Sequence, residues 1–229
     1  MEKHPNSTRP TASANAAATW ILTVCVLITV ALQVYRFSAP QTRAAGQVRF
    51  EPSWDRFLTG GSEIRDSSAS ATLLIFSDYE CVYCARLFGT LDSLRAEGAK
   101  FRIIYRHLPS SRHRFAVLAA KASVCAERQG AFEKMNSTLL RRQATFGLEP
   151  WWASAKLAGI KDSTQFESCM STIDLTAKLG ADSLAADALK IGGTPTIFIE
   201  GVRIEGAPPT TQLLKYLDEK QREALREDR

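Results

Sequence analysis

Two cysteines close together in the sequence are the residues best suited to chemistry. Cys81 and Cys84 have the spacing Cys-x-x-Cys, follow an apolar run at residues 72–76 and open a helical pattern. Two thiols at this spacing can exchange between a dithiol and a disulfide. The unpaired N–H groups and the dipole of a helix N-terminus favour a thiolate at Cys81, which is therefore the predicted nucleophile. Cys84, one turn further into the helix, is the predicted resolving thiol.

A Gly-Thr-Pro-Thr motif much later in the chain could supply the second half of a site. It precedes an apolar run at residues 196–199. An X-Pro bond tolerates the cis form far better than other peptide bonds do, so Pro195 could aim the backbone of Thr194 at an extended substrate peptide. An ordinary proline at the start of a strand is the alternative interpretation.

Half of a zinc site is the alternative interpretation of the Cys-x-x-Cys pair. Zinc usually takes four ligands, commonly from two such pairs. The cysteines at positions 125 and 169 are isolated in the sequence, and the three histidines, His4, His107 and His113, do not complete a zinc spacing. We therefore favour redox chemistry and expect neither a metal nor a cofactor.

Both motifs carry a resemblance to a known family. The segment at residues 76–84, Phe-Ser-Asp-Tyr-Glu-Cys-Val-Tyr-Cys, resembles the active-site segment of the DsbA-like thiol–disulfide oxidoreductases of the thioredoxin superfamily. Residues 192–201 resemble the cis-proline loop of that family and the strand after it. The resemblance implies an α/β, thioredoxin-like fold with a helical insertion. This sequence departs from the family pattern at Val82, where the family often has Pro or Gly, and at Tyr83, where strong oxidases often have His.

The resemblance also implies roles for residues outside the cysteine pair. Thr194 and Pro195 are expected to contact the substrate, as are Val82 and Tyr83 between the cysteines. Thioredoxin-like proteins often carry a buried acid six residues before the first cysteine, and here that position is Ile75.

A second, structural disulfide occurs in the helical region of some DsbA-like proteins. Cys125 and Cys169 lie in separate predicted helices of this region and are the candidates for it. Two buried free thiols are the alternative.

The apolar periodicity predicts the elements that would position these residues. A strand at 71–77, a helix at 82–97 and a strand at 101–106 form a βαβ unit. The sheet resumes at 196–199 and ends with a strand at 202–204, which pairs with it across a turn at Glu200-Gly201. Helices are expected at 114–128, 131–142, 150–158, 163–172, 175–190 and 211–226.

Charged residues next to these elements have two possible interpretations. Arg106 ends the second predicted strand and His107 follows it, and sites in parallel α/β units lie beyond the carboxyl ends of strands. They could therefore lie near Cys81 and favour its thiolate, or they could be ordinary surface residues. Glu80, the neighbour of Cys81, is expected to oppose the thiolate.

Length and composition fit one folded domain with extensions. The chain has 229 residues, of which 45% are hydrophobic, and a net charge of only +5. Basic and acidic residues are interspersed, so no nucleic-acid partner is expected. The expected organisation is a tail at 1–15, a transmembrane signal anchor at 16–35, a linker and N-terminal extension at 36–69, and a thioredoxin-like domain at 70–229 with its insertion at about 109–190.

The expected anchor, residues 16–35, carries no charge. As a helix it would be about 30 Å long, which suffices to cross a hydrocarbon core. Trp20 and Tyr35 lie near its ends, where aromatic rings favour the membrane interface. A cleavable signal peptide is the alternative, although its apolar region would normally be shorter. Cys25 would be a residue of the membrane helix.

The hypothesis from the sequence is a single-pass protein of the inner membrane with its catalytic domain on the periplasmic or extracytoplasmic side. The flanking charges do not decide the orientation, but a disulfide enzyme is useful in an oxidising compartment. It would introduce disulfides into secreted proteins, and a membrane redox partner would recycle it. A reductase or isomerase, and a tethered chaperone or binding module without turnover, are the alternatives.

Overall fold

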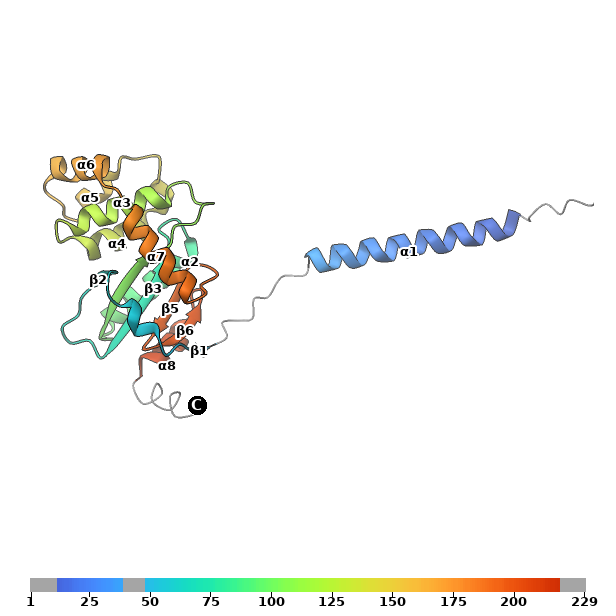
Figure 1. The fold of residues 1–229 in the computed structure, drawn as a ribbon, viewed down its shortest axis with the longest axis horizontal. Helices are drawn as coiled ribbons and strands as arrows, with labels where there is room; N and C mark the ends of the chain where they lie inside the picture. Colours follow the sequence, from blue (N-terminus) through green and yellow to red (C-terminus); the bar gives the residue numbers. More distant parts are fainter. Residues whose placement is uncertain (1–11, 39–47, 219–229) are drawn as a thin grey trace, which may run out of the picture. The chain divides into compact units, whose positions relative to one another are not determined.

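The computed structural model describes residues 12–38 and 48–218 and divides the chain into two units, Met1–Ala44 and Ala45–Arg229. The first unit contains the helix α1 (Ala12–Ser38), whose side chains are described for residues 19–33 and are exposed there (Figure 1). Among the described residues, no helix combines the length and the apolar character that a membrane span needs. The expected anchor at residues 16–35 extends beyond the described side chains and stays a prediction.

The second unit is built on a mixed sheet of six strands (Figure 1). β3 (Ala71–Ser77) lies inside it, parallel to β4 (Phe101–His107) and antiparallel to β5 (Thr196–Ile199). β5 and β6 (Val202–Glu205) form a hairpin. The turn between them, Glu200-Gly201, has positive φ at both residues, as a two-residue hairpin turn of this kind requires.

The parallel strands bring the active-site segment to one edge of the sheet. β3 is buried along its whole length, as a strand covered on both faces should be. Its register places Ser77 beside His107 at the carboxyl ends of the two strands. The chain then passes through Cys81 into α2 (Val82–Ala96) and returns to β4, which completes the expected βαβ unit.

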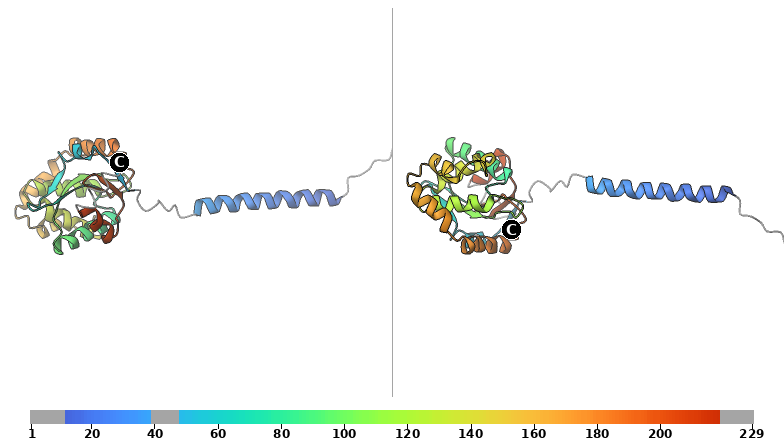
Figure 2. Two further views of the ribbon diagram at one scale, coloured as in Figure 1. Left: turned by 90° about the horizontal axis from the view of Figure 1, so that it is seen from below. Right: turned by 90° about the horizontal axis from the view of Figure 1, so that it is seen from above.

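Helices cover both faces of the sheet (Figure 2). α2 and α8 (Thr210–Leu217) lie on one face, where Leu87 and Leu213 belong to the larger apolar core. α7 (Thr176–Ala188) lies on the other face, where Ala185 packs in a smaller core against strand residues. The sheet is therefore the middle of three layers, and its strand ends remain available for a site.

A helical insertion between β4 and α7 gathers at one end of the sheet (Figure 1). A disulfide joins Cys125 to Cys169 within it, with the two Cα atoms 5.7 Å apart. The insertion consists of α3 (Ala116–Glu127), α4 (Phe132–Arg141), η2 (Gln143–Thr145), α5 (Trp151–Leu157) and α6 (Ser163–Thr172). Together with α7, these α-helices are the five that the sequence predicts between residues 114 and 190, each within two residues of the expected bounds.

The structure differs from the expected elements at the two ends of the domain. β1 (Arg49–Phe50) pairs with β6, and β2 (Ser62–Ile64) pairs with β4, so part of the expected linker and extension at 36–69 belongs to the sheet. Both strands are too short to show an alternating pattern in the sequence. The closing helix, α8, ends at residue 217, and residues 219–226 of its expected range lie outside the described residues.

Candidate active site

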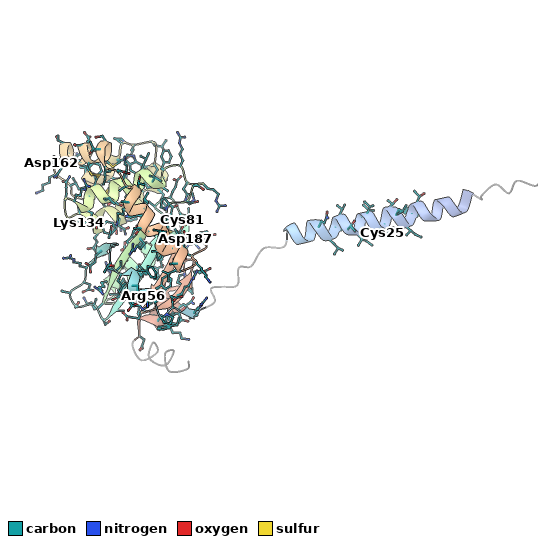
Figure 3. All side chains as sticks on the ribbon, viewed as in Figure 1. Cys25, Arg56, Cys81, Lys134, Asp162 and Asp187 are labelled. Atoms are coloured by element: carbon teal, nitrogen blue, oxygen red, sulfur yellow. A yellow bond between two sulfur atoms is a disulfide. The ribbon has the colours of Figure 1, made fainter. Side chains whose placement is uncertain are left out.

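Cys81 lies at the N-terminal cap of α2. Its carbonyl oxygen accepts hydrogen bonds from the backbone N–H groups of Cys84, at 3.0 Å, and Ala85, at 3.2 Å. Cys81 is 8% exposed, whereas Cys84 is 0% exposed. Figure 3 labels Cys81 where the helical insertion meets the sheet. An incoming sulfur could therefore reach Cys81 but not Cys84.

The proline motif lies directly against the first cysteine. The Thr194–Pro195 peptide bond is cis. The sulfur of Cys81 lies 3.4 Å from the carbonyl oxygen of Thr194, to which its thiol can donate a weak hydrogen bond. The two motifs, which are far apart in the sequence, thus meet at one site.

The surroundings of Cys81 lower the pKa of its thiol to about 5. The largest cause is a hydrogen bond from the Cys84 thiol, and the backbone N–H groups of Cys84 and Tyr83 and the side chain of Thr194 act in the same direction. Burial acts against them. Cys81 is therefore a thiolate at neutral pH, which is the reactive form of cysteine.

Cys84 has the opposite environment. Burial is the main reason why the pKa of its thiol is raised far above the ordinary value, and its hydrogen bond to Cys81 and the charge there raise it further. The backbone N–H of Asp78 lies 3.5 Å from the Cys84 sulfur. One accessible thiolate beside one buried thiol is the arrangement needed for attack at the first sulfur and resolution by the second.

Asp78 organises the loop that leads into Cys81. Its buried carboxylate accepts hydrogen bonds from the backbone N–H of Glu80, at 2.8 Å, and from that of Ser110, at 2.7 Å. One of its oxygens also lies 2.7 Å from Nδ1 of His113. These contacts tie the active-site loop to the segment that follows β4.

Glu80 is turned toward the helical insertion. Its carboxylate accepts a hydrogen bond from the backbone N–H of Phe115 at 2.6 Å, at the start of α3. The main influences on the Cys81 pKa come from other groups. The carboxylate of Glu80 is engaged by this hydrogen bond, and its expected opposition to the thiolate stays a prediction.

Gln143 holds the loop from the insertion side. Its Nε2 donates to the carbonyl oxygens of Tyr79, at 2.7 Å, and Cys81, at 3.0 Å. Sequence reasoning missed Gln143, because nothing in its own neighbourhood marks a residue of η2 as a partner of a loop 62 residues away. Asp78, in contrast, lies within the motif segment and could have been singled out there.

The interpretation of Arg106 and His107 as ordinary surface residues is wrong, and their expected influence on the Cys81 thiolate stays a prediction. Successive strand residues point to opposite faces, and both side chains are buried. Arg106 points to the α7 face, where its guanidinium pairs with Asp182 at 2.8 Å. His107 lies on the other face, with its ring tilted by 60° relative to that of Tyr105, and burial lowers the pKa of His107 to about 3.

The residues between the cysteines form the exposed rim of the site. Val82 is 64% exposed and Tyr83 is 54% exposed. The guanidinium of Arg86 lies 5.4 Å from the centre of the Tyr83 ring. In the part of the chain that the structure describes, no group of three or more His, Cys, Asp and Glu side chains is arranged to hold a metal ion.

A family model described as Thioredoxin matches residues 61–219. Among curated proteins, the Na(+)/H(+) antiporter NhaA 1 of Mycolicibacterium gilvum is 32% identical over 154 residues, which are 66% of this chain and 25% of that protein. The chain thus spans about a quarter of the length of the curated relatives it matches.

Solved structures share the fold at low sequence identity. A periplasmic thioredoxin-like protein from Salmonella enterica serovar Typhimurium has a TM-score of 0.61 and 22% identity, over 76% of this chain and 98% of that one. The thiol-disulfide exchange protein alpha-DsbA2 from Wolbachia pipientis has a TM-score of 0.61 and 23% identity, over 71% of this chain and 88% of that one. Since the family model covers more than half of the residues, this chain belongs to the thioredoxin family, and its fold is that of DsbA-like thiol–disulfide exchange proteins.

Proposed function

We propose that this chain is a thiol–disulfide oxidoreductase in which Cys81 is the nucleophile and Cys84 the resolving thiol. The contrast between the two thiols carries the proposal. Cys81 is accessible at a helix N-terminus and has a pKa lowered to about 5, chiefly by the Cys84 thiol, while Cys84 is fully buried with a raised pKa. A merely structural cysteine pair has no need of this difference.

The oxidising reaction takes two steps at this site. A client thiolate attacks the Cys81 sulfur of the enzyme disulfide, and Cys84 leaves with the electron pair and takes up a proton. A second client thiolate then attacks the client sulfur of the mixed disulfide, which forms the client disulfide and releases Cys81 as a thiolate. Two electrons pass from the client to the enzyme, and the reductase direction is the reverse.

The low pKa of Cys81 favours the oxidising direction. A stabilised thiolate stabilises the reduced enzyme, and a stable reduced form makes the disulfide a stronger oxidant. Two members of the superfamily illustrate this trend: a thiol pKa of about 3.5 accompanies a potential of about −120 mV in DsbA, and a pKa of about 7 accompanies about −270 mV in thioredoxin. A reductase or isomerase with the same fold, or a binding module without turnover, is the alternative.

Substrate docking is proposed at the rim around Cys81. Val82 and Tyr83 offer exposed apolar surface. The carbonyl oxygen of Thr194, the residue before the cis Pro195, lies 3.4 Å from the Cys81 sulfur. An extended client segment could pair with that backbone while its cysteine approaches Cys81.

We also propose an extracytoplasmic location and an anchor at residues 16–35. The uncharged run supports the anchor, and the disulfide in the helical insertion fits an oxidising compartment. The curated relatives are named as Na(+)/H(+) antiporters, and one structural neighbour is described as periplasmic. A redox partner in the same membrane would reoxidise the cysteine pair.

Trapping of mixed disulfides tests the proposed function. Cys84→Ala keeps the nucleophile and removes the resolving thiol, so it should accumulate client adducts that reducing agent releases on a gel. Cys81→Ala is the matched control and should form none. Equal adducts in both variants would overturn the assignment of the two thiols, and no adducts in either would favour a binding module.

A further inference from the structure

Buried polar side chains lie at the ends of β3 and β4, next to Asp78, whose backbone N–H lies 3.5 Å from the Cys84 sulfur, and the proposed reaction does not yet use them. Ser77 ends β3, and Tyr105 and His107 lie on β4. All three are at most 1% exposed. The ring of Tyr105 lies 4.9 Å from that of His107 and 5.2 Å from that of Tyr79, measured between centroids.

Thioredoxin-like proteins often carry a buried carboxylate six residues before the first cysteine, and this chain has none at that position. That position is Ile75, which is 0% exposed. Yet a Cys84 thiolate must form in both directions of the proposed reaction, as the leaving group in oxidation and as the nucleophile in resolution. Burial makes this thiolate costly, because it raises the pKa of the Cys84 thiol.

Ser77 has a hydroxyl available for this task. No described protein group forms a hydrogen bond of ordinary geometry with its Oγ, although the side chain is 1% exposed. Its interaction with Cys84 favours the thiolate, as does that of the Asp78 backbone N–H at 3.5 Å from the sulfur. A serine hydroxyl rotates freely, so its proton can turn toward a sulfur that becomes charged.

We propose that Ser77 is a catalytic residue whose hydroxyl donates a hydrogen bond to the Cys84 sulfur while that sulfur carries negative charge, in place of proton transfer to a buried carboxylate. This inference rests on the proposed function of the cysteine pair. In resolution, the Cys84 sulfur attacks Cys81, the bond between Cys81 and the client sulfur breaks, and the Cys81–Cys84 bond forms. The client sulfur leaves with the electron pair and takes up a proton, which balances the proton that Cys84 loses.

The tyrosine and histidine side chains near the cysteine pair stay neutral. Burial raises the pKa of Tyr79 and of Tyr105, and it lowers the pKa of His107 to about 3. The carboxylates of the active-site loop are engaged by other groups, Asp78 by Ser110 and His113, and Glu80 by Phe115. When Cys84 ionises in either direction, Cys81 is bonded to the client sulfur and carries no charge. Burial is then what opposes the Cys84 thiolate, and hydrogen-bond donors are what the surrounding side chains offer.

The attack by Cys81 and the attack by Cys84 can be measured separately with dithiobis(nitrobenzoate), an aromatic disulfide that releases a coloured thiolate. The full chain carries Cys25→Ser to remove an exposed free thiol, and the cysteine pair is reduced under mild conditions. Attack by Cys81 releases the first aromatic thiolate, and attack by Cys84 on the resulting mixed disulfide releases the second. Ser77→Ala should slow the second phase about tenfold, which corresponds to a barrier about 1.4 kcal/mol higher, and leave the first unchanged.

Matched variants separate this role from a structural one. Ser154→Ala removes another buried serine, in α5, and should leave both phases unchanged. Ser77→Thr keeps a hydroxyl and should retain most of the second-phase rate. In Ser77→Ala, the rise of the second phase with pH should also move to higher pH, which loss of packing alone would not produce.

The outcomes distinguish this inference from the proposed function. Absence of a second phase in the chain with native Ser77 would refute the proposed function itself. Two phases there, with the same second-phase rate and pH profile in Ser77→Ala, would overturn the role of Ser77 alone. Equal slowing of both phases in Ser77→Ala would also overturn it, because the change would then act on the whole site.

Discussion

Replacing Cys84 by alanine should raise the pKa of Cys81. The thiol of Cys84 is the largest single influence that lowers the Cys81 pKa to about 5. Cys84→Ala removes that donor but leaves the helix, the backbone N–H groups and Thr194 in place. Because position 84 is fully buried, bulk solvent does not reach it to replace the lost donor.

The size of the rise follows from the strength of one charge-assisted hydrogen bond. Such a bond contributes about 1.5–3 kcal/mol, and 1.36 kcal/mol corresponds to one pKa unit, so the Cys81 pKa should rise by about 1 to 2. Cys84→Ser is the matched control, because it keeps a hydroxyl donor and should raise the pKa less.

The rate of alkylation of Cys81 by iodoacetamide, followed by mass spectrometry against pH on a Cys25→Ser background, reports this pKa. The midpoint should move to higher pH in Cys84→Ala and by less in Cys84→Ser. An unchanged or lower midpoint in Cys84→Ala would refute the reasoning, since the backbone and the helix terminus would then suffice to stabilise the thiolate.

Three further predictions concern the support of the site. Cys169→Ala opens the disulfide of the helical insertion, whose sequence separation is 44, and should lower the free energy of unfolding by about 4 kcal/mol in the chain-entropy model, measured by denaturant titration. Asp182→Ala breaks a fully buried ion pair and should lower it by about 3–5 kcal/mol, whereas Asp187→Ala on the exposed side of the same helix should change it little. Gln143→Ala loses two hydrogen bonds to the active-site loop and should lower the free energy of unfolding by about 1–3 kcal/mol. The control is Gln129→Ala, which loses a single hydrogen bond of 3.4 Å at the half-buried Gln129; equal effects of the two glutamine variants would contradict the role of Gln143 in holding the loop.

The centre of the fold was predictable because its signals are local. Residues 72–76 form a continuous apolar run before a Cys-x-x-Cys helix start, which is the pattern of a buried parallel strand. Glu200-Gly201 between two apolar runs indicated the hairpin that the structure contains. The helices of the insertion showed their periodicity within their own segments, so their bounds could also be inferred.

The remainder depends on contacts between distant segments. Residues 49–50 and 62–64 become the short edge strands β1 and β2 because they pair with β6 and β4, which distant parts of the chain form. Gln143 reaches the active-site loop only after the insertion has folded against it. The buried Arg106 pairs with Asp182, which lies 76 residues away, and no local sequence pattern predicts that pair.

The reduction potential of the Cys81–Cys84 couple is the most direct test of the central claim. The chain would be equilibrated with glutathione buffers of graded ratio, and the fraction of Cys81–Cys84 disulfide would be measured by mass spectrometry after acid quenching. The low Cys81 pKa predicts a single two-electron transition at a potential well above the value of about −270 mV for thioredoxin. A potential at or below that value would contradict an oxidant, and a pair that does not exchange with glutathione at all would contradict thiol–disulfide exchange at this site.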